Sequence, residues 1–128
     1  MNPDKIKGKI MYIEDEVEAL TTMMDFLNPR GFAVLPYITA EQAYDKLREL
    51  NPDLIIVDVR LIGETGLDFI ERIQKEGIET PVIVITGYAG ITDEIKERKL
   101  KIYGCFEKPF KFSQLYQSIT QILEVNQL

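Results

Sequence analysis

The sequence predicts an α/β protein in which a doubly wound, five-stranded parallel sheet carries helices on both faces. Short apolar runs alternate five times with longer segments of helical periodicity, and turn-forming residues separate the two kinds of segment. The most apolar runs are unbroken aliphatic stretches, as expected of strands covered on both faces. The 128 residues, 45% hydrophobic and 28% charged, fit one globular domain spanning residues 1–128, with its core at about 7–124.

Two strand-helix units are expected in the first 50 residues. Residues 9–13 are the first predicted strand, and an amphipathic helix follows until Asn-Pro-Arg-Gly at residues 28–31 stops it. After a second strand at 32–35, the spacing of Thr39 and Gln42 predicts a capping box at the start of the next helix. The side chains expected to face the core are Val17, Leu20, Met24 and Leu27 in the first helix and Ala40, Ala43, Tyr44, Leu47 and Leu50 in the second.

Three further units complete the pattern. Residues 53–58 contain four consecutive aliphatic residues and predict a central strand, after which Gly63 and Gly66 bracket a loop. A strand at 82–85 leads through Thr86 to a mostly charged helix at 91–100, which is expected to be weakly held, and a last strand follows at about 101–107. The core-facing residues expected in the three helices are Ile70 and Ile73, then Ile91, Ile95 and Leu100, then Phe112, Leu115, Tyr116, Ile119, Ile122 and Leu123.

The composition excludes several classes of chemistry. The chain has no histidine, so it cannot by itself supply a Ser-His-Asp or Cys-His nucleophile, an imidazole zinc ligand or a histidine proton shuttle. The single cysteine, Cys105, cannot form an intrachain disulfide, and we expect it to be a small core residue in a cytoplasmic protein. A net charge of −6 argues against direct nucleic-acid binding, and no signal-peptide core or membrane span is evident.

Polar residues stand where four of the five predicted strands end. Glu14 and Asp15 follow the first strand, Asp58 ends the third, Thr86 follows the fourth and Lys108 follows the fifth. Since ligand sites in open parallel sheets lie beyond the carboxyl ends of the strands, these side chains are expected to converge at one edge. Two carboxylates about 5 Å apart repel by roughly 3 kcal/mol at an effective dielectric constant of about 20. The cluster therefore requires positive charge.

The convergence predicts chemistry on a phosphoryl group. Lys108 brings one positive charge, and the remaining negative charge, with oxygen-only ligands, favours Mg²⁺ over zinc or copper. A carboxylate beside Mg²⁺, an ammonium group and a hydroxyl has the parts needed for phosphoryl transfer to an aspartate. Asp58 is the candidate nucleophile because its strand is the most apolar. If the group comes from phosphohistidine, that histidine belongs to another protein.

Three residues of the set also have an ordinary structural explanation. Asp15, with a glutamate three positions later, has the spacing of a helix cap, and Asp58 or Thr86 alone would suit a turn or a strand-to-loop exit. Arg60 and Tyr88, two positions beyond Asp58 and Thr86, would either control the access of water to an acyl phosphate or be plain loop residues. The joint occurrence of the set at one edge favours the functional interpretation.

The predicted site resembles that of a known family. The match extends over about residues 7–123 and is carried by Glu14-Asp15, Asp58, Thr86 and Lys108-Pro109. In this order, on a five-fold strand-helix alternation, these residues resemble the receiver domain of two-component response regulators, chemotaxis regulators among them. The resemblance implies a flavodoxin-like (βα)5 fold.

The resemblance also implies a role for each site residue. Asp58 would be the phosphoacceptor and a Mg²⁺ ligand, together with Asp15 and the backbone carbonyl of Arg60. Glu14 would assist the metal through water. The remaining implied roles are the switch hydroxyl at Thr86, its ion-pair partner Lys108 and a cis peptide bond to Pro109.

Three positions depart from the family pattern. Cys105 stands three residues before Lys108, where the family usually places the Tyr or Phe of an aromatic switch. Phe106 or Tyr103 would replace it only in a shifted strand, and a one-residue slip would turn the side chains to the opposite face. Ile62 stands where a proline is common, and Glu14 where Asp is commoner.

The sequence therefore predicts a signalling domain rather than an enzyme. A histidine kinase or histidine phosphotransfer protein would load Asp58, and a protein target or a missing output domain would respond through the face of the fourth helix, fifth strand and fifth helix. One alternative is a pseudo-receiver that binds partners without phosphorylation, supported by Cys105 and Ile62. A phosphatase or a flavin carrier is disfavoured because residues 14–16 read Glu-Asp-Glu rather than Asp-x-Asp or a phosphate loop.

Overall fold

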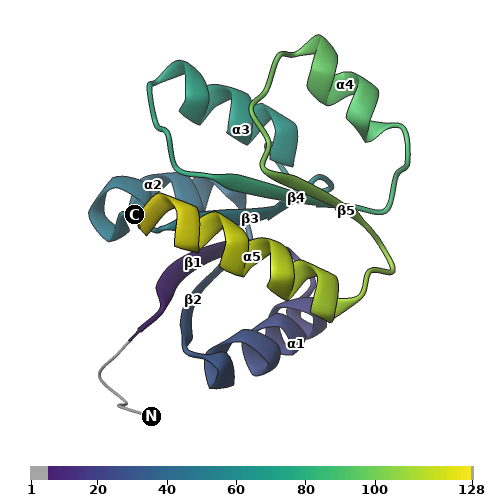
Figure 1. Cartoon of the computed structure of the whole chain (residues 1–128). Helices are drawn as coiled ribbons and strands as arrows, with labels where there is room; N and C mark the ends of the chain where they lie inside the picture. Colours follow the sequence, from purple (N-terminus) through teal and green to yellow (C-terminus); the bar gives the residue numbers. More distant parts are fainter. Residues whose placement is uncertain (1–5, 128) are drawn as a thin grey trace.

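Five strands and five α-helices alternate along the chain in the computed structural model, which describes residues 6–127, the last three by backbone alone. Residues 1–5 and 128 of the expected domain lie outside the described residues. The elements are β1 (Gly8–Ile13), α1 (Val17–Leu27), a 3-10 turn (Asn28–Arg30), β2 (Phe32–Tyr37), α2 (Ala40–Leu50), β3 (Leu54–Asp58), α3 (Gly66–Lys75), β4 (Val82–Thr86), α4 (Ile91–Glu97), β5 (Gly104–Glu107) and α5 (Phe112–Gln127). Their order is the predicted one (Figure 1).

The strands form one parallel sheet in the order β2-β1-β3-β4-β5. Helices α1 and α5 cover one face, and α2, α3 and α4 cover the other (Figure 1). Every residue of β3 and β4 is buried because these central strands are covered on both sides. The predicted doubly wound α/β fold is confirmed.

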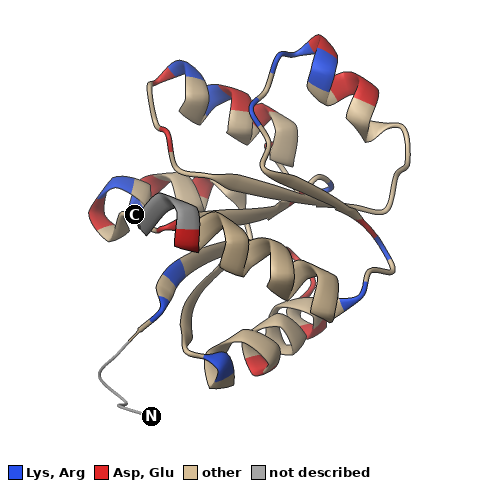
Figure 2. Ribbon diagram, in the orientation of Figure 1, with Lys and Arg blue, Asp and Glu red and all other residues tan. Residues whose placement is uncertain are grey.

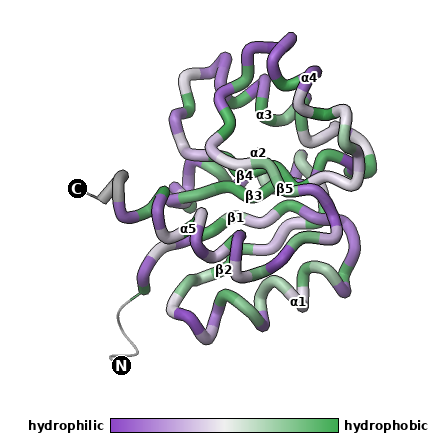
Figure 3. The backbone as a smooth tube through the Cα atoms, turned by 45° about the vertical axis from the view of Figure 1, so that its right-hand side comes forward, coloured by the Kyte–Doolittle hydropathy of each residue, from purple (hydrophilic) through white to green (hydrophobic). Residues whose placement is uncertain are grey.

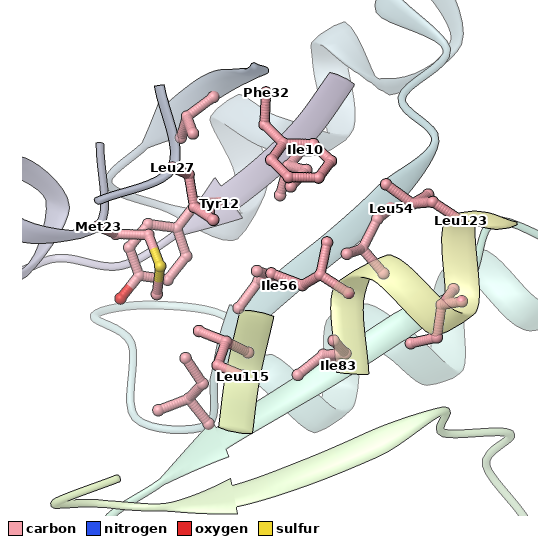
Figure 4. Packing of buried hydrophobic residues seen from close by; sticks show 14 of the residues in the cluster. Ile10, Tyr12, Met23, Leu27, Phe32, Leu54, Ile56, Ile83, Leu115 and Leu123 are labelled. Carbon is pink, nitrogen blue, oxygen red and sulfur yellow. The ribbon is translucent and has the colours of Figure 1, made fainter. Parts of the chain in front are cut away.

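Two apolar layers result from the alternation of side chains along the strands. In β3, Ile56 points to the layer of α1 and α5, shown in Figure 4, whereas Ile55 and Val57 point to the layer of α2, α3 and α4. The central strands β3 and β4 are accordingly mostly hydrophobic, and the helices alternate between hydrophobic and hydrophilic residues (Figure 3). No helix among the described residues is long and apolar enough to cross a bilayer.

Local signals set the helix ends. The Thr39 side chain accepts a hydrogen bond from the Gln42 N–H at 3.1 Å, which is one of the two bonds of the predicted capping box. Thr65 accepts the N–H of Asp68 in the same way at 3.2 Å. Gly31, with a φ of 98°, leads from the turn after α1 into β2. Charged residues gather on α2, α3 and α4, whereas the part of α5 that is not grey carries few of them (Figure 2).

Two expected core residues lie outside the core. Val17 is 69% exposed, whereas Met23, which was not among the expected residues, is buried in α1. Val17 is the first residue of its helix, next to the loop that follows β1. Cys105 is exposed as well, because β5 is a four-residue edge strand on which every second side chain points outward. The core expectation for Cys105 is therefore wrong.

Candidate functional site

Three polar side chains are buried at the carboxyl edge of the sheet. Glu14, Asp58 and Thr86 are 1%, 4% and 2% exposed and are the buried polar residues of the described chain. Glu14 directly follows β1, while Asp58 ends β3 and Thr86 ends β4. Parallel pairing of these strands brings the three residues to one edge, as the sequence predicts.

Lys108, directly after β5, joins the two buried carboxylates. Its Nζ lies 2.5 Å from Asp58 Oδ2 and 3.2 Å from Glu14 Oε1. The other oxygen of each carboxylate accepts a backbone N–H, from Arg60 to Asp58 Oδ1 at 2.8 Å and from Glu16 to Glu14 Oε2 at 3.2 Å. Both carboxylates are thus oriented by the main chain on one side and by a shared ammonium group on the other.

The charges of this group do not balance. Burial, followed by the charge of Asp58, raises the pKa of Glu14 from 4.5 to about 7. Burial works to lower the pKa of Lys108, but its hydrogen bond to Asp58 and the charges of both carboxylates raise it overall. Two carboxylates therefore share one cation, and a second cation would stabilise the ionised site.

The donor set fits a hard divalent cation in its chemistry. Two buried carboxylates with excess negative charge are oxygen ligands of the kind that Mg²⁺ prefers, and Mg²⁺ retains several waters in protein sites. Among the described residues, no three Asp, Glu or Cys side chains are grouped as a preformed cage. A bound Mg²⁺ would thus need water and main-chain oxygen to complete its shell.

Asp15 lies next to Glu14 and is half-buried. The alternative in which it caps the first helix is wrong, because the N-cap of α1 is Glu16 and no side chain caps this end. The backbone of Glu16 instead donates its N–H to Glu14, which keeps the turn tight. Asp15 is therefore available at the site edge without a capping role.

The Thr86 hydroxyl is held by the loop that follows it. Thr86 Oγ1 accepts the N–H of Tyr88 at 2.9 Å and donates to the carbonyl of Tyr88 at 3.2 Å. The carbonyl of Thr86 accepts the N–H of Lys108 at 2.7 Å, so the ends of β4 and β5 are tied together. The hydroxyl thus faces the β4–α4 loop rather than the carboxylates.

The register of β5 decides where its aromatic residue lies. Cys105 pairs with Val84 and Phe106 with Ile85, so the strand is not shifted. Phe106 is half-buried and packs against the layer of α1 and α5, opposite to the outward Cys105. The peptide bond between Lys108 and Pro109 is cis, as the resemblance implies.

Two residues, Tyr12 and Gly66, have roles at the site that the sequence did not predict. Tyr12 lies two residues before Glu14, and burial followed by the charges of Glu14 and Asp58 raises its pKa. Because side chains two residues apart in a strand lie on the same face, the spacing of Tyr12 and Glu14 could have indicated this neighbour. Gly66 passes so close to the carbonyl of Asp58 that a Cβ there would overlap it, and would lie 3.0 Å from the Cα of Val59. Only the fold shows this contact.

Comparison with known proteins places the chain in a family. Residues 10–120 match the response regulator receiver domain family. The chain is 33% identical over 122 residues to a probable C4-dicarboxylate response regulator, DctR, of Halalkalibacterium halodurans, covering 91% of this chain and 52% of that protein. YkoG of Bacillus subtilis, a transcriptional regulatory protein, is 28% identical over 120 residues, covering 94% and 53%.

Solved structures agree on the fold. NtrX from Brucella abortus superposes with a TM-score of 0.82 at 26% identity, over 94% of this chain and 27% of that one. A receiver domain of a Francisella response regulator gives 0.86 at 18% identity, over 93% and 98%. The chain belongs to the response regulator receiver domains of two-component systems. It spans about half the length of the first curated relatives it matches.

Proposed function

We propose that this receiver domain accepts a phosphoryl group on Asp58 in the presence of Mg²⁺. The observation that carries the proposal is the contact of Lys108 Nζ with Asp58 Oδ2, 2.5 Å long, at a buried edge that also holds Glu14. An aspartate beside a fixed ammonium group is suited to receive a dianionic group, because the ammonium offsets the charge that arrives. Membership of the receiver family supports the same role for Asp58.

The transfer would be a displacement at phosphorus. A carboxylate oxygen of Asp58 forms a bond to phosphorus, the bond from phosphorus to the donor nitrogen breaks, and the protonated donor ring leaves as neutral imidazole. Lys108 and Thr86 would donate hydrogen bonds to the equatorial oxygens. Bound Mg²⁺ would neutralise charge on the transferred group, held by Asp15, Asp58, the carbonyl of Arg60 and, through water, Glu14.

The donor and the target are proposed to be proteins. Because this sequence contains no histidine, the phosphohistidine would come from a histidine kinase or a phosphotransfer protein. The output would pass through α4, β5 and α5, either to a separate protein or to an output domain outside this sequence. An apolar groove of about 220 Å³ between α4 and β5, which Ile95 and Cys105 help to line, supports a contact surface there.

We further propose a cytoplasmic signalling role rather than turnover of an external substrate, with residues 1–128 forming one receiver unit. Neither nucleic acid nor membrane is proposed as a direct partner, in keeping with the net charge of −6.

A phosphodonor experiment tests the proposal. The protein is incubated with Mg²⁺ and a small phosphodonor such as acetyl phosphate, and its intact mass is measured. We expect one added phosphoryl group on the wild type and on Asp45→Asn, an exposed control on α2, and none on Asp58→Asn. EDTA should prevent the addition. An adduct that persists in Asp58→Asn would exclude Asp58 as the acceptor.

A phosphorylation-independent scaffold is the second candidate. The exposure of Ile62, at 75%, and of Cys105 favours it, because both positions offer side chains for contact rather than for phosphoryl chemistry. This alternative predicts an unmodified wild type in the same experiment.

A further inference from the structure

The loop after β4 links the Thr86 hydroxyl to the start of α4 through Tyr88. The carbonyl of Tyr88 accepts the Thr86 hydroxyl at 3.2 Å and also the N–H of Ile91, the first residue of α4, at 3.4 Å. Ile91 is buried in the layer of α2, α3 and α4. A movement of the Thr86 hydroxyl away from Tyr88 would therefore remove one of the two bonds at this carbonyl and alter the anchoring of α4.

The ring of Tyr88 occupies the space above Gly90, although it is 53% exposed. A Cβ at Gly90 would lie 2.5 Å from the phenol oxygen, 2.7 Å from Cζ and 3.1 Å from Cε1 of Tyr88. The backbone of Gly90, with φ −77° and ψ 0°, is one that any residue can adopt. A side chain at position 90 would therefore meet the ring of Tyr88 and not a backbone constraint.

No comparable ring from β5 lies beside this loop among the described residues. Cys105 and Glu107 are the outward residues of the strand, and Glu107 pairs with Thr86. Phe106 points to the opposite layer. Tyr88 is therefore the aromatic residue whose backbone N–H and carbonyl hold the Thr86 hydroxyl, and its ring lies against Gly90.

We propose that Tyr88 is a positioning residue whose ring, packed on Gly90, keeps the Thr86 hydroxyl on the loop side of the site until Asp58 carries a phosphoryl group. The inference rests on the proposed function, since it concerns the control of the same site. When the hydroxyl turns toward the phosphoryl oxygens, its bond to the Tyr88 carbonyl breaks. The ring then leaves Gly90, and the start of α4 is free to shift.

The loop offers a matched pair of variants to test this. In Gly90→Ala the new methyl group displaces the far end of the Tyr88 ring, and in Gly87→Ala the methyl group meets no atom within 4 Å. Tyr88→Ala removes the ring, and Tyr88→Phe retains it. Binding of beryllofluoride with Mg²⁺, a tetrahedral mimic of the phosphoryl group, is measured by titration for all four variants and the wild type, and thermal melting checks that each one is folded.

Releasing the ring should favour the phosphorylated conformation. We expect Gly90→Ala and Tyr88→Ala to need about threefold to tenfold less beryllofluoride for half-saturation, the range that a single aromatic contact supports. Tyr88→Phe and Gly87→Ala should stay near the wild type. If Gly90→Ala matches Gly87→Ala, or if Tyr88→Ala weakens binding, the inference is wrong and the proposed function stands.

A spectroscopic variant gives a second readout. The chain has no tryptophan, so Tyr88→Trp places a single indole at the loop. Its emission should change when beryllofluoride binds and remain unchanged when Asp58→Asn is added to the same variant. A constant emission despite binding would show that the ring does not move. Absence of a phosphoryl adduct on the wild type would overturn both this inference and the proposed function.

Discussion

Replacing Glu14 with glutamine is expected to stabilise the metal-free protein at neutral pH, and to do so less as the pH falls. Glu14 is 1% exposed, and its pKa is raised from 4.5 to about 7 by burial and then by the charge of Asp58. Each pKa unit corresponds to 1.36 kcal/mol, so the ionised side chain lowers the free energy of unfolding by about 3 kcal/mol well above pH 7. Glutamine keeps the shape without the charge.

The sign follows from proton binding. Folding raises the pKa of Glu14, so the native state holds this proton more tightly than the unfolded state does. The stabilisation from the protonated carboxyl is complete below about pH 4.5 and is lost as the pH rises through about 7. Glu14→Gln has no proton to lose at this position. The difference between the two proteins should therefore grow from near zero at pH 4.5 to its full size near pH 8.

Urea unfolding in EDTA, followed by circular dichroism across this pH range, measures the difference. Glu79→Gln, an exposed position in the α3–β4 loop, serves as the control and should track the wild type. A difference that does not change with pH would refute the electrostatic reasoning. A variant less stable than the wild type at pH 8 would show that the contact with Lys108 outweighs the repulsion from Asp58.

Three further substitutions or reactions follow from the same geometry. Lys108→Met leaves two buried carboxylates without their shared cation and should lower the free energy of unfolding in EDTA by about 2 kcal/mol, a loss that Mg²⁺ partly restores in urea melts. Gly66→Ala places a methyl group against the backbone at the end of β3 and should cost about 2 kcal/mol or more, whereas Gly87→Ala should cost little. Partial burial, followed by the charge of Glu107, raises the pKa of the Cys105 thiol. Iodoacetamide should therefore alkylate Cys105 more slowly at pH 8 than it alkylates a free cysteine peptide, and faster in Glu107→Gln than in the wild type. Mass spectrometry of this single-cysteine chain measures the rates, and equal rates would show that the reasoning is wrong.

Much of the fold follows from local patterns in the sequence. Unbroken aliphatic runs identify β3 and β4 because only central parallel strands are covered on both faces. The convergence of Glu14, Asp58 and Lys108 follows in turn, since strand ends determine where the side chains meet. The sequence thus predicts which residues gather, because topology rather than detailed packing controls that outcome.

The sequence does not predict features that depend on more than the order of strands and helices along the chain. Val17 fits the helical stripe of α1, but its exposure depends on where the helix begins relative to the sheet. Cys105 fits a buried strand only if β5 is central, and the sheet order places β5 at an edge. The bonds between Thr86 and Tyr88 depend on a loop conformation that no periodicity encodes.

The charges at the site link its instability to its proposed chemistry. Ionised Glu14 and Asp58 with Lys108 leave one net negative charge in a buried region. Phosphorylation would neutralise Asp58 but add about −1.5 to −2, so the excess would grow rather than disappear. A divalent cation would offset two units of this negative charge. Glu14→Gln should therefore raise the free energy of unfolding of the metal-free protein and weaken Mg²⁺ binding, because the same negative charge destabilises the metal-free protein and attracts the metal.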